Sequence, residues 1–265
     1  MSKTRKLVEC AVLVALAFIL SLISVIKMPF GGEITAACMF PIIIAAYRNG
    51  LGWGIISAFA FSLLQLLTGL KNVGYATSAT AAVAIILLDY IIAFTVIGLI
   101  GIWKRNARQN TVLVFGTIGV CILRYLCHVI SGATVWAGLS IPTKEALVYS
   151  LVYNMAYMVP ELVITIFVTA WISNSLNLRE DSIKTRLKSS KLEKVLYSIW
   201  PTVLAILVDF IYLFFVVQTE EGFDITRITT SKPSVLIWVT AGGIALSLYT
   251  YFIMTLAGMK SKKNN

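Results

Sequence analysis

Charged residues are scarce in this chain, and the motifs of most enzymes are missing. Only 13% of its 265 residues are charged, against ~25% in a typical soluble domain. The four cysteines form no CxxC pair and there is one histidine, so neither a metal site nor a disulfide framework is indicated. Phosphate-binding loops, HExxH, GxSxG and nucleophile–base arrangements are also absent. We therefore expect no enzyme, no metal and no cofactor.

In place of charge the sequence has long apolar runs. Apolar residues make up 58% of the chain, and the mean hydropathy is +0.87. A bilayer core of ~30 Å needs about 20 helical residues, and the runs of about that length are 7–26, 52–70, 76–103, 110–137, 145–176, 195–218 and 233–258. The sequence therefore predicts an all-α integral membrane protein. We expect Leu7–Ile26 to be a retained first helix, because its Ala-Leu-Ala triplet lies in mid-run rather than after the run, where signal peptidase cleaves.

One further run, Ala36–Tyr47, is too short to cross by itself, since its dozen residues cover roughly 18 Å as a helix. It follows the broken segment 28–33 and contains Pro41. Irregular backbone at membrane depth persists only where it is buried in protein or lines a polar cavity. The stretch 28–47 is therefore the first indication of a site.

The basic residues test the number of crossings. With the N-terminus inside, eight crossings place 16 Lys and Arg residues in inner segments and five in outer ones, with Arg124 left inside a span. We therefore expect both termini to be cytoplasmic. The net charge of +10 comes without any nucleic-acid motif, so we interpret it as topology and lipid attraction, with no nucleic-acid partner.

The most charged stretch, 177–194, predicts an internal boundary. We expect a six-span membrane domain over 1–176, a basic cytoplasmic linker over 177–194, and a two-span extension over 195–265. Leu178, Ile183 and Leu187 favour a helix on the inner membrane surface, and a solvated linker is the alternative.

Ionisable residues inside spans are costly, at ~2.5 kcal/mol or more on insertion scales, so each one is a candidate functional residue. They are Asp89, Arg124, His128, Glu161 and Asp209. Asp89 lies in mid-span, where it either pairs with Arg124 or provides the counter-charge for a cationic ligand.

Two spans carry polar residues at four-residue spacing, which places each set on one helical face. The first set is Arg124, His128, Gly132 and Trp136; the second is Tyr149, Tyr153, Tyr157 and Glu161, with Asn154 nearby. Tyr149 alone also fits an interfacial aromatic belt. Together with Asp89, these residues suit a planar, aromatic, positively charged small molecule, because aromatic faces attract cations by ~0.5–2 kcal/mol each.

These residues resemble a known family. The segments 28–35, 89–90, 124–128, 131–132, 149–154 and 160–161, with Trp136, are similar to the thiamine-binding substrate (S) subunits of energy-coupling factor transporters. The resemblance covers residues 1–176. It implies a six-helix bundle that captures thiamine outside the cell. It also implies that thiamine is passed inward by association with a membrane coupling subunit and two ATPase subunits.

The resemblance also implies residue roles. Asp89, Tyr90, His128, Trp136, Tyr149 and Asn154 would line the thiamine pocket, and Arg124 and Gly132 are further candidates on the same helical face. Ala11 and Ala15 would dock on the coupling subunit through a small-xxx-small face, as would the offset pair Ala17 and Ser21, with internal packing as the alternative.

The sequence departs from the family pattern at two places. Family members commonly carry Glu where Asp89 stands, which leaves the ligand open among thiamine, its phosphates and related vitamins. The last two spans have no counterpart in the six-helix pattern, and the sequence gives them no role. The alternative function is a self-sufficient proton-coupled carrier for a cationic or aromatic solute, with Asp89, His128 and Glu161 as a relay.

Overall fold

The computed structural model describes residues 2–28, 31–103, 108–138, 143–179, 183–185, 195, 198–219, 222–223 and 225–263. The chain forms two compact units, Met1–Lys184 and Thr185–Asn265. Six helical stretches among the described residues are long and apolar enough to cross a membrane: Leu51–Tyr75, Ala79–Ile102, Gln109–Val135, Lys144–Ser175, Trp200–Val217 and Pro233–Ile253. This confirms an all-α, multi-pass membrane protein. The first two of the eight predicted spans are present as helices but do not reach these limits of length and composition.

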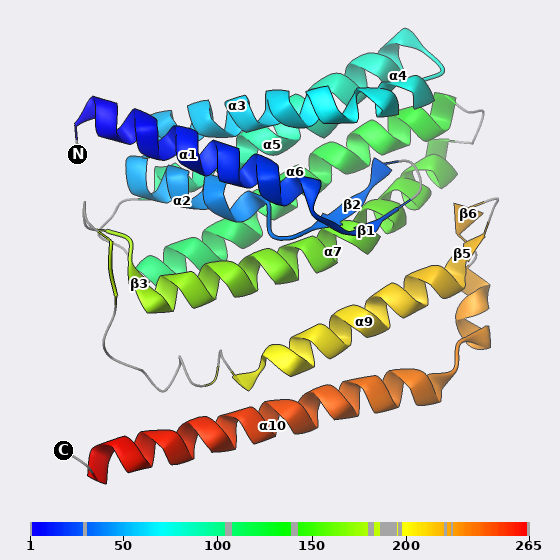
Figure 1. Cartoon of the computed structure of the whole chain (residues 1–265). Helices are drawn as coiled ribbons and strands as arrows, with labels where there is room; N and C mark the ends of the chain where they lie inside the picture. Colours follow the sequence, from blue (N-terminus) through cyan, green and yellow to red (C-terminus); the bar gives the residue numbers. More distant parts are fainter. Residues whose placement is uncertain are drawn as a thin grey trace. The chain divides into compact units, whose positions relative to one another are not determined.

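The first unit is a bundle of helices with one short hairpin (Figure 1). Its elements in chain order are α1 (Lys3–Leu22), β1 (Ser24–Lys27), β2 (Glu33–Thr35), α2 (Met39–Asn49), α3 (Leu51–Gly69), η2 (Leu70–Tyr75), α4 (Ala79–Ala84), η3 (Ile85–Ile92), α5 (Ala93–Thr95), η4 (Val96–Ile102), α6 (Gln109–Gly138), α7 (Thr143–Ser175), β3 (Leu176–Asn177) and β4 (Lys184–Thr185). The short helix α2 forms the middle of the core, and every one of its residues except Phe40 is buried.

The first helix ends earlier than the sequence predicted. Ser2 caps α1 by accepting a hydrogen bond from the Arg5 amide at 3.3 Å, and the helix stops at Leu22 instead of Ile26. Residues 24–27 form strand β1 instead, because they pair with β2 in an antiparallel register that sets Lys27 opposite Glu33. The predicted break at 28–33 therefore coincides with the connection between β1 and β2 and with the first residue of β2. Pro29 and Phe30 lie outside the described residues.

The predicted span 76–103 is helical throughout but changes its winding. Ser78 caps α4, π-helix η3 follows, and 3-10 helix η4 closes the stretch. Helix η4 packs so closely on α3 that their backbones are in contact. A Cβ on Gly98 would lie 2.6 Å from the Gly54 carbonyl oxygen. The glycines therefore permit an approach that any larger residue at these positions would prevent.

The start of the predicted linker belongs to the first unit. Leu178 is 1% exposed, its carbonyl accepts from Arg48 Nη1 at 2.8 Å, and its amide donates to Gln109 Oε1 at 3.0 Å. Arg48 also pairs with Glu9 at 2.5 Å, so α1, α2 and this segment are joined. Of the predicted linker 177–194, residues 177–179 and 183–185 are described: Leu178 is buried, and Lys184–Thr185 forms strand β4, which pairs with β3, so this part does not form the predicted surface helix. The rest of the linker lies outside the described residues.

The second unit is an antiparallel pair of helices, α9 (Trp200–Val217) and α10 (Pro233–Lys263), joined by β5 (Gln218–Thr219), β6 (Gly222–Phe223) and η5 (Ile225–Thr230) (Figure 1). Polar contacts link the two helices: the Thr202 amide donates to Ser247 Oγ at 3.1 Å, and the Thr240 hydroxyl donates to Asp209. The buried Asp209 therefore has a partner within its own helix pair.

Candidate substrate-binding site

A cavity of about 410 Å³ opens in the first unit between the hairpin, η2, η3, α6 and α7. Six of the predicted pocket residues line it: Asp89, Tyr90, Arg124, His128, Gly132 and Asn154. Tyr149 is not among its lining residues. The side chain of Trp136 lies outside the described part of the structure.

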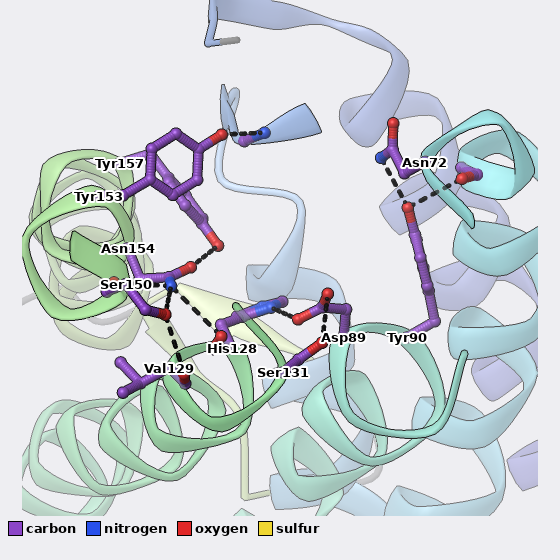
Figure 2. A network of polar contacts seen from close by, with 12 residues as sticks. Asn72, Asp89, Tyr90, His128, Val129, Ser131, Ser150, Tyr153, Asn154 and Tyr157 are labelled. Atoms are coloured by element: carbon purple, nitrogen blue, oxygen red, sulfur yellow. Dashed lines mark hydrogen bonds and ion pairs between the residues drawn. The ribbon is translucent and has the colours of Figure 1, made fainter. Parts of the chain in front are cut away.

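Asp89 and His128 form the polar centre of this cavity (Figure 2). Asp89 Oδ1 lies 2.8 Å from His128 Nδ1, and Asp89 Oδ2 accepts a hydrogen bond from the Ser131 hydroxyl at 2.8 Å. The Asp89 side chain is still 26% exposed, whereas the His128 side chain is 9% exposed. Within the described residues, His128 Nε2 has no hydrogen-bond partner. The partly exposed carboxylate is therefore open to a ligand, and the buried Nε2 is a polar atom that still lacks a partner.

Arg124 is not the partner of Asp89, although the sequence left that pairing open. It lies one turn before His128 on α6, with its guanidinium 4.3 Å from the centre of the Phe94 ring. Its Nη1 lies 3.1 Å from the Met39 sulfur. Asp89 pairs instead with His128.

Tyr90 follows Asp89 in sequence but contacts a different element. Its hydroxyl donates to the Gly69 carbonyl at 3.0 Å and accepts from Asn72 Nδ2 at 2.8 Å, so it ties η3 to the turn η2. Figure 2 shows Asn72 and Tyr90 on one side of Asp89, and His128 on the other. Asp89 thus faces α6, whereas Tyr90 fixes the cavity wall formed by η2.

Asn154 and Gly132 mainly join α6 to α7. Asn154 Nδ2 donates to the Ser150 carbonyl at 2.8 Å and the His128 carbonyl at 3.3 Å, and Asn154 Oδ1 accepts from Tyr157 at 2.6 Å. The Ser150 hydroxyl occupies the space that a side chain on Gly132 would need. Gly132 was predicted as a pocket residue and does line the cavity, and its lack of a side chain also lets α7 pack closely on α6.

The tyrosines of α7 form a row of ring contacts, stacked between Tyr149 and Tyr153 and edge-to-face between Tyr153 and Tyr157. Tyr153 lies between its neighbours, with ring centres 6.2 Å from Tyr149 and 5.8 Å from Tyr157. Tyr153 and Tyr157 line the cavity, and Tyr149 supports Tyr153 from behind with its ring nearly parallel. The Tyr153 hydroxyl also accepts a hydrogen bond from the Gly32 amide at 3.0 Å.

A family model described as thiamine transporter protein (Thia_YuaJ) matches residues 7–180. The chain belongs to this family. It is also 32% identical over 158 residues to thiamine transporter ThiT of Bacillus subtilis (strain 168), a match that covers 55% of this chain and 78% of that protein. The family resemblance predicted from the sequence is confirmed, and family membership makes the chain a transporter, not an enzyme. The two C-terminal helices lie beyond the matched residues.

For a member of this family, the cavity contains residues that the sequence did not single out. They include Gln65 from α3, and Asn72 and Tyr75 from η2. Glu33, Tyr153 and Tyr157 also line the cavity: Glu33 lies in the segment 28–35 that resembles the family, and the two tyrosines share the four-residue spacing of Tyr149. Asn72 and Tyr75 follow an apolar run, where they look like an ordinary loop, so no pattern distinguished them.

The small residues of α1 separate into two groups. Ala11 and Ala15 are exposed, whereas Ala17 and Ser21 are buried. Internal packing therefore accounts for Ala17 and Ser21. Docking remains our prediction for Ala11 and Ala15 only.

Proposed function

We propose that the chain is a high-affinity thiamine-binding membrane subunit of an energy-coupling factor transporter. The observation that carries the proposal is the Asp89–His128 pair, with an unpartnered imidazole nitrogen, in a cavity that is also lined by tyrosine rings. The cavity volume of about 410 Å³ falls in the range of about 300–1,000 Å³ typical of small-molecule sites. Thiamine joins two planar aromatic rings, an aminopyrimidine and a cationic thiazolium, so the acid, the imidazole and the aromatic rings of the cavity each have a counterpart in the ligand.

The contacts of Asp89 and His128 support a separate role for each residue. A carboxylate at His128 Nδ1 fixes the tautomer that carries its proton on that nitrogen, which leaves Nε2 as an acceptor. An exocyclic amino group of an aminopyrimidine can then donate to Nε2. The charge of Asp89 compensates the thiazolium, while the rings of Tyr153 and Tyr157 offer their faces to it. Trp136 and Tyr149 complete the predicted set.

The energy for uptake would come from partner subunits, since the chain has no nucleotide-binding motif. The exposed Ala11 and Ala15 support a docking face on α1 for a coupling membrane subunit that works with two ATPases. The excess of basic residues in the predicted inner segments supports cytoplasmic termini.

The alternative, a proton relay through Asp89, His128 and Glu161, has less support. Glu161 is not a lining residue of the cavity, and its carboxylate accepts hydrogen bonds from Thr35. Uptake of thiamine by the protein alone in vesicles with a pH gradient would favour that carrier and contradict the subunit proposal.

A binding titration tests the proposal directly. Purified full-length protein is titrated with thiamine, its phosphates and a neutral vitamin, by calorimetry and tryptophan fluorescence. We expect tight binding of thiamine with fluorescence quenching, and weaker binding of the neutral vitamin. Absence of binding at micromolar thiamine would refute the function.

A further inference from the structure

Glu161 is the most deeply buried acid of the described residues, with 1% of its surface exposed. Its Oε2 accepts from the Thr35 amide at 2.7 Å, and its Oε1 accepts from the Thr35 hydroxyl at 2.7 Å. The Cys38 thiol lies 3.7 Å from Oε1. A buried carboxylate is costly unless hydrogen bonds satisfy it. Here a single short segment, 35–38, supplies the donors.

That segment leads from the cavity wall into the core. Thr35 ends strand β2, and Ala37 has a φ of 60°, a left-handed conformation that is uncommon for a residue with a side chain. Such backbone persists where its surroundings impose it. The Thr35 hydroxyl, fixed by Glu161, also accepts from the Cys38 amide at 3.2 Å just before α2 begins.

Strand β2 is fastened to α7 at both ends. Tyr153 binds the Gly32 amide and Glu161 binds Thr35. These two side chains are eight residues apart, which places them on the same face of α7. Gly32 and Glu33 line the cavity between these anchors. The position of this wall therefore depends on Glu161, although Glu161 itself does not reach the cavity.

The charge of Glu161 bears on the cavity through Arg124. Arg124 lines the cavity, is 7% exposed, and in the described structure its Nε is buried without a hydrogen-bond partner. Glu161 contacts Cys38, and Arg124 contacts the next residue, Met39, so the two charges lie near each other in the buried interior, where charges are screened less than in water. Asp89 and Glu33 are the acids that line the cavity together with Arg124. Without Glu161, Arg124 would be left with these two cavity carboxylates as its counter-charges.

We propose that Glu161 is a positioning residue that selects for a cationic ligand. Its hydrogen bonds to Thr35 hold β2 against α7, and its charge balances Arg124, so that Asp89 remains available to the ligand. This inference rests on the proposed thiamine-binding function.

Glu161→Gln tests the charge, because glutamine retains the size and can still accept from the Thr35 amide. Full-length wild type and variant are titrated with thiamine and with 3-deazathiamine, in which a neutral thiophene replaces the thiazolium. We expect the Kd for thiamine to rise by about tenfold or more, and that for the neutral analogue to change by less than about threefold. If Glu161 had only a structural role, the substitution would raise the Kd of both ligands equally, and that result would overturn the proposal. Failure of the wild type to bind thiamine would instead refute the proposed function.

Thr35→Val tests the anchor, with Thr165→Val as the matched control. Thr165 lies one turn beyond Glu161 on α7, is fully buried, and has a hydroxyl with no partner in the described structure. We expect thiamine to dissociate several-fold faster from Thr35→Val than from the wild type, and at the wild-type rate from Thr165→Val, in a stopped-flow chase. Equal rates in the two variants would contradict the positioning role.

Discussion

Replacing Asp89 with asparagine removes the negative charge offered to the ligand but can keep the hydrogen bonds that Asp89 makes within the protein. Asparagine has nearly the same shape as aspartate. Its oxygen can accept from His128 Nδ1, and its amide can donate to Ser131, so both 2.8 Å contacts have a substitute. Only the negative charge is lost. The variant should therefore fold, with a loss of stability near the ~1 kcal/mol of one weakened hydrogen bond.

The loss of affinity should be much larger. Removing one partner of a buried charge pair costs about 2–5 kcal/mol, or roughly 30-fold to 4,000-fold in Kd. Because 26% of the Asp89 side chain is exposed, some of that charge is solvated, and we expect the lower end, about 30- to 100-fold. Asp89→Glu keeps the charge and should bind thiamine far better than the asparagine variant.

Calorimetry gives the affinity, and thermal unfolding without ligand gives the stability. Binding within about threefold of the wild type would show that the carboxylate does not meet the cation. A large fall in unfolding temperature with unchanged affinity would assign Asp89 to the fold instead of the ligand.

Three further predictions concern the surroundings of the site. Gly32→Ala should raise the thiamine dissociation rate, because the new Cβ would lie 2.8 Å from the Tyr153 hydroxyl; Gly74→Ala, with nothing within 4 Å, is its control. Tyr90→Phe should lower the unfolding free energy by about 1 kcal/mol, measured in thermal melts, because it removes the link between η3 and η2; an unchanged melt would contradict that link. Ala15→Trp should leave thiamine binding intact but abolish co-purification with a coupling subunit, and intact co-purification would exclude this face as the docking surface.

Apolar runs and residue spacing were the reliable predictors of structure in this sequence. The apolar runs predicted the spans. The four-residue spacing predicted that Arg124, His128 and Gly132 share a helical face, and that face lines the cavity. The break at 28–33 was visible because a dozen-residue helix is too short to cross. These inferences depend on dimensions that every membrane helix shares.

The remaining details depend on contacts between distant segments. Residues 24–27 form a strand because they pair with residues 33–35. The local sequence does not indicate that pairing, so it predicted a helix that continues to Ile26. The partner of Asp89 was also undetermined, since Arg124 and His128 share one face of α6 and only the packed structure chooses between them. Asn72 lines the cavity because Tyr90 holds η2 in place, a contact that spans 18 residues.

The π-helix η3 gives this transporter an unusual route to a new ligand. Asp89 and Tyr90 both lie within its eight residues, where the winding is wider than in an α-helix. Because a π turn holds one residue more than an α turn, deleting one residue of 86–88 would return the segment to α winding and move mainly the side chains within it, Asp89 among them. The contact of Asp89 with His128 would then be lost although no cavity residue had been substituted. The position of the acid in this pocket is thus set by the length of the chain as well as by the identity of its residues.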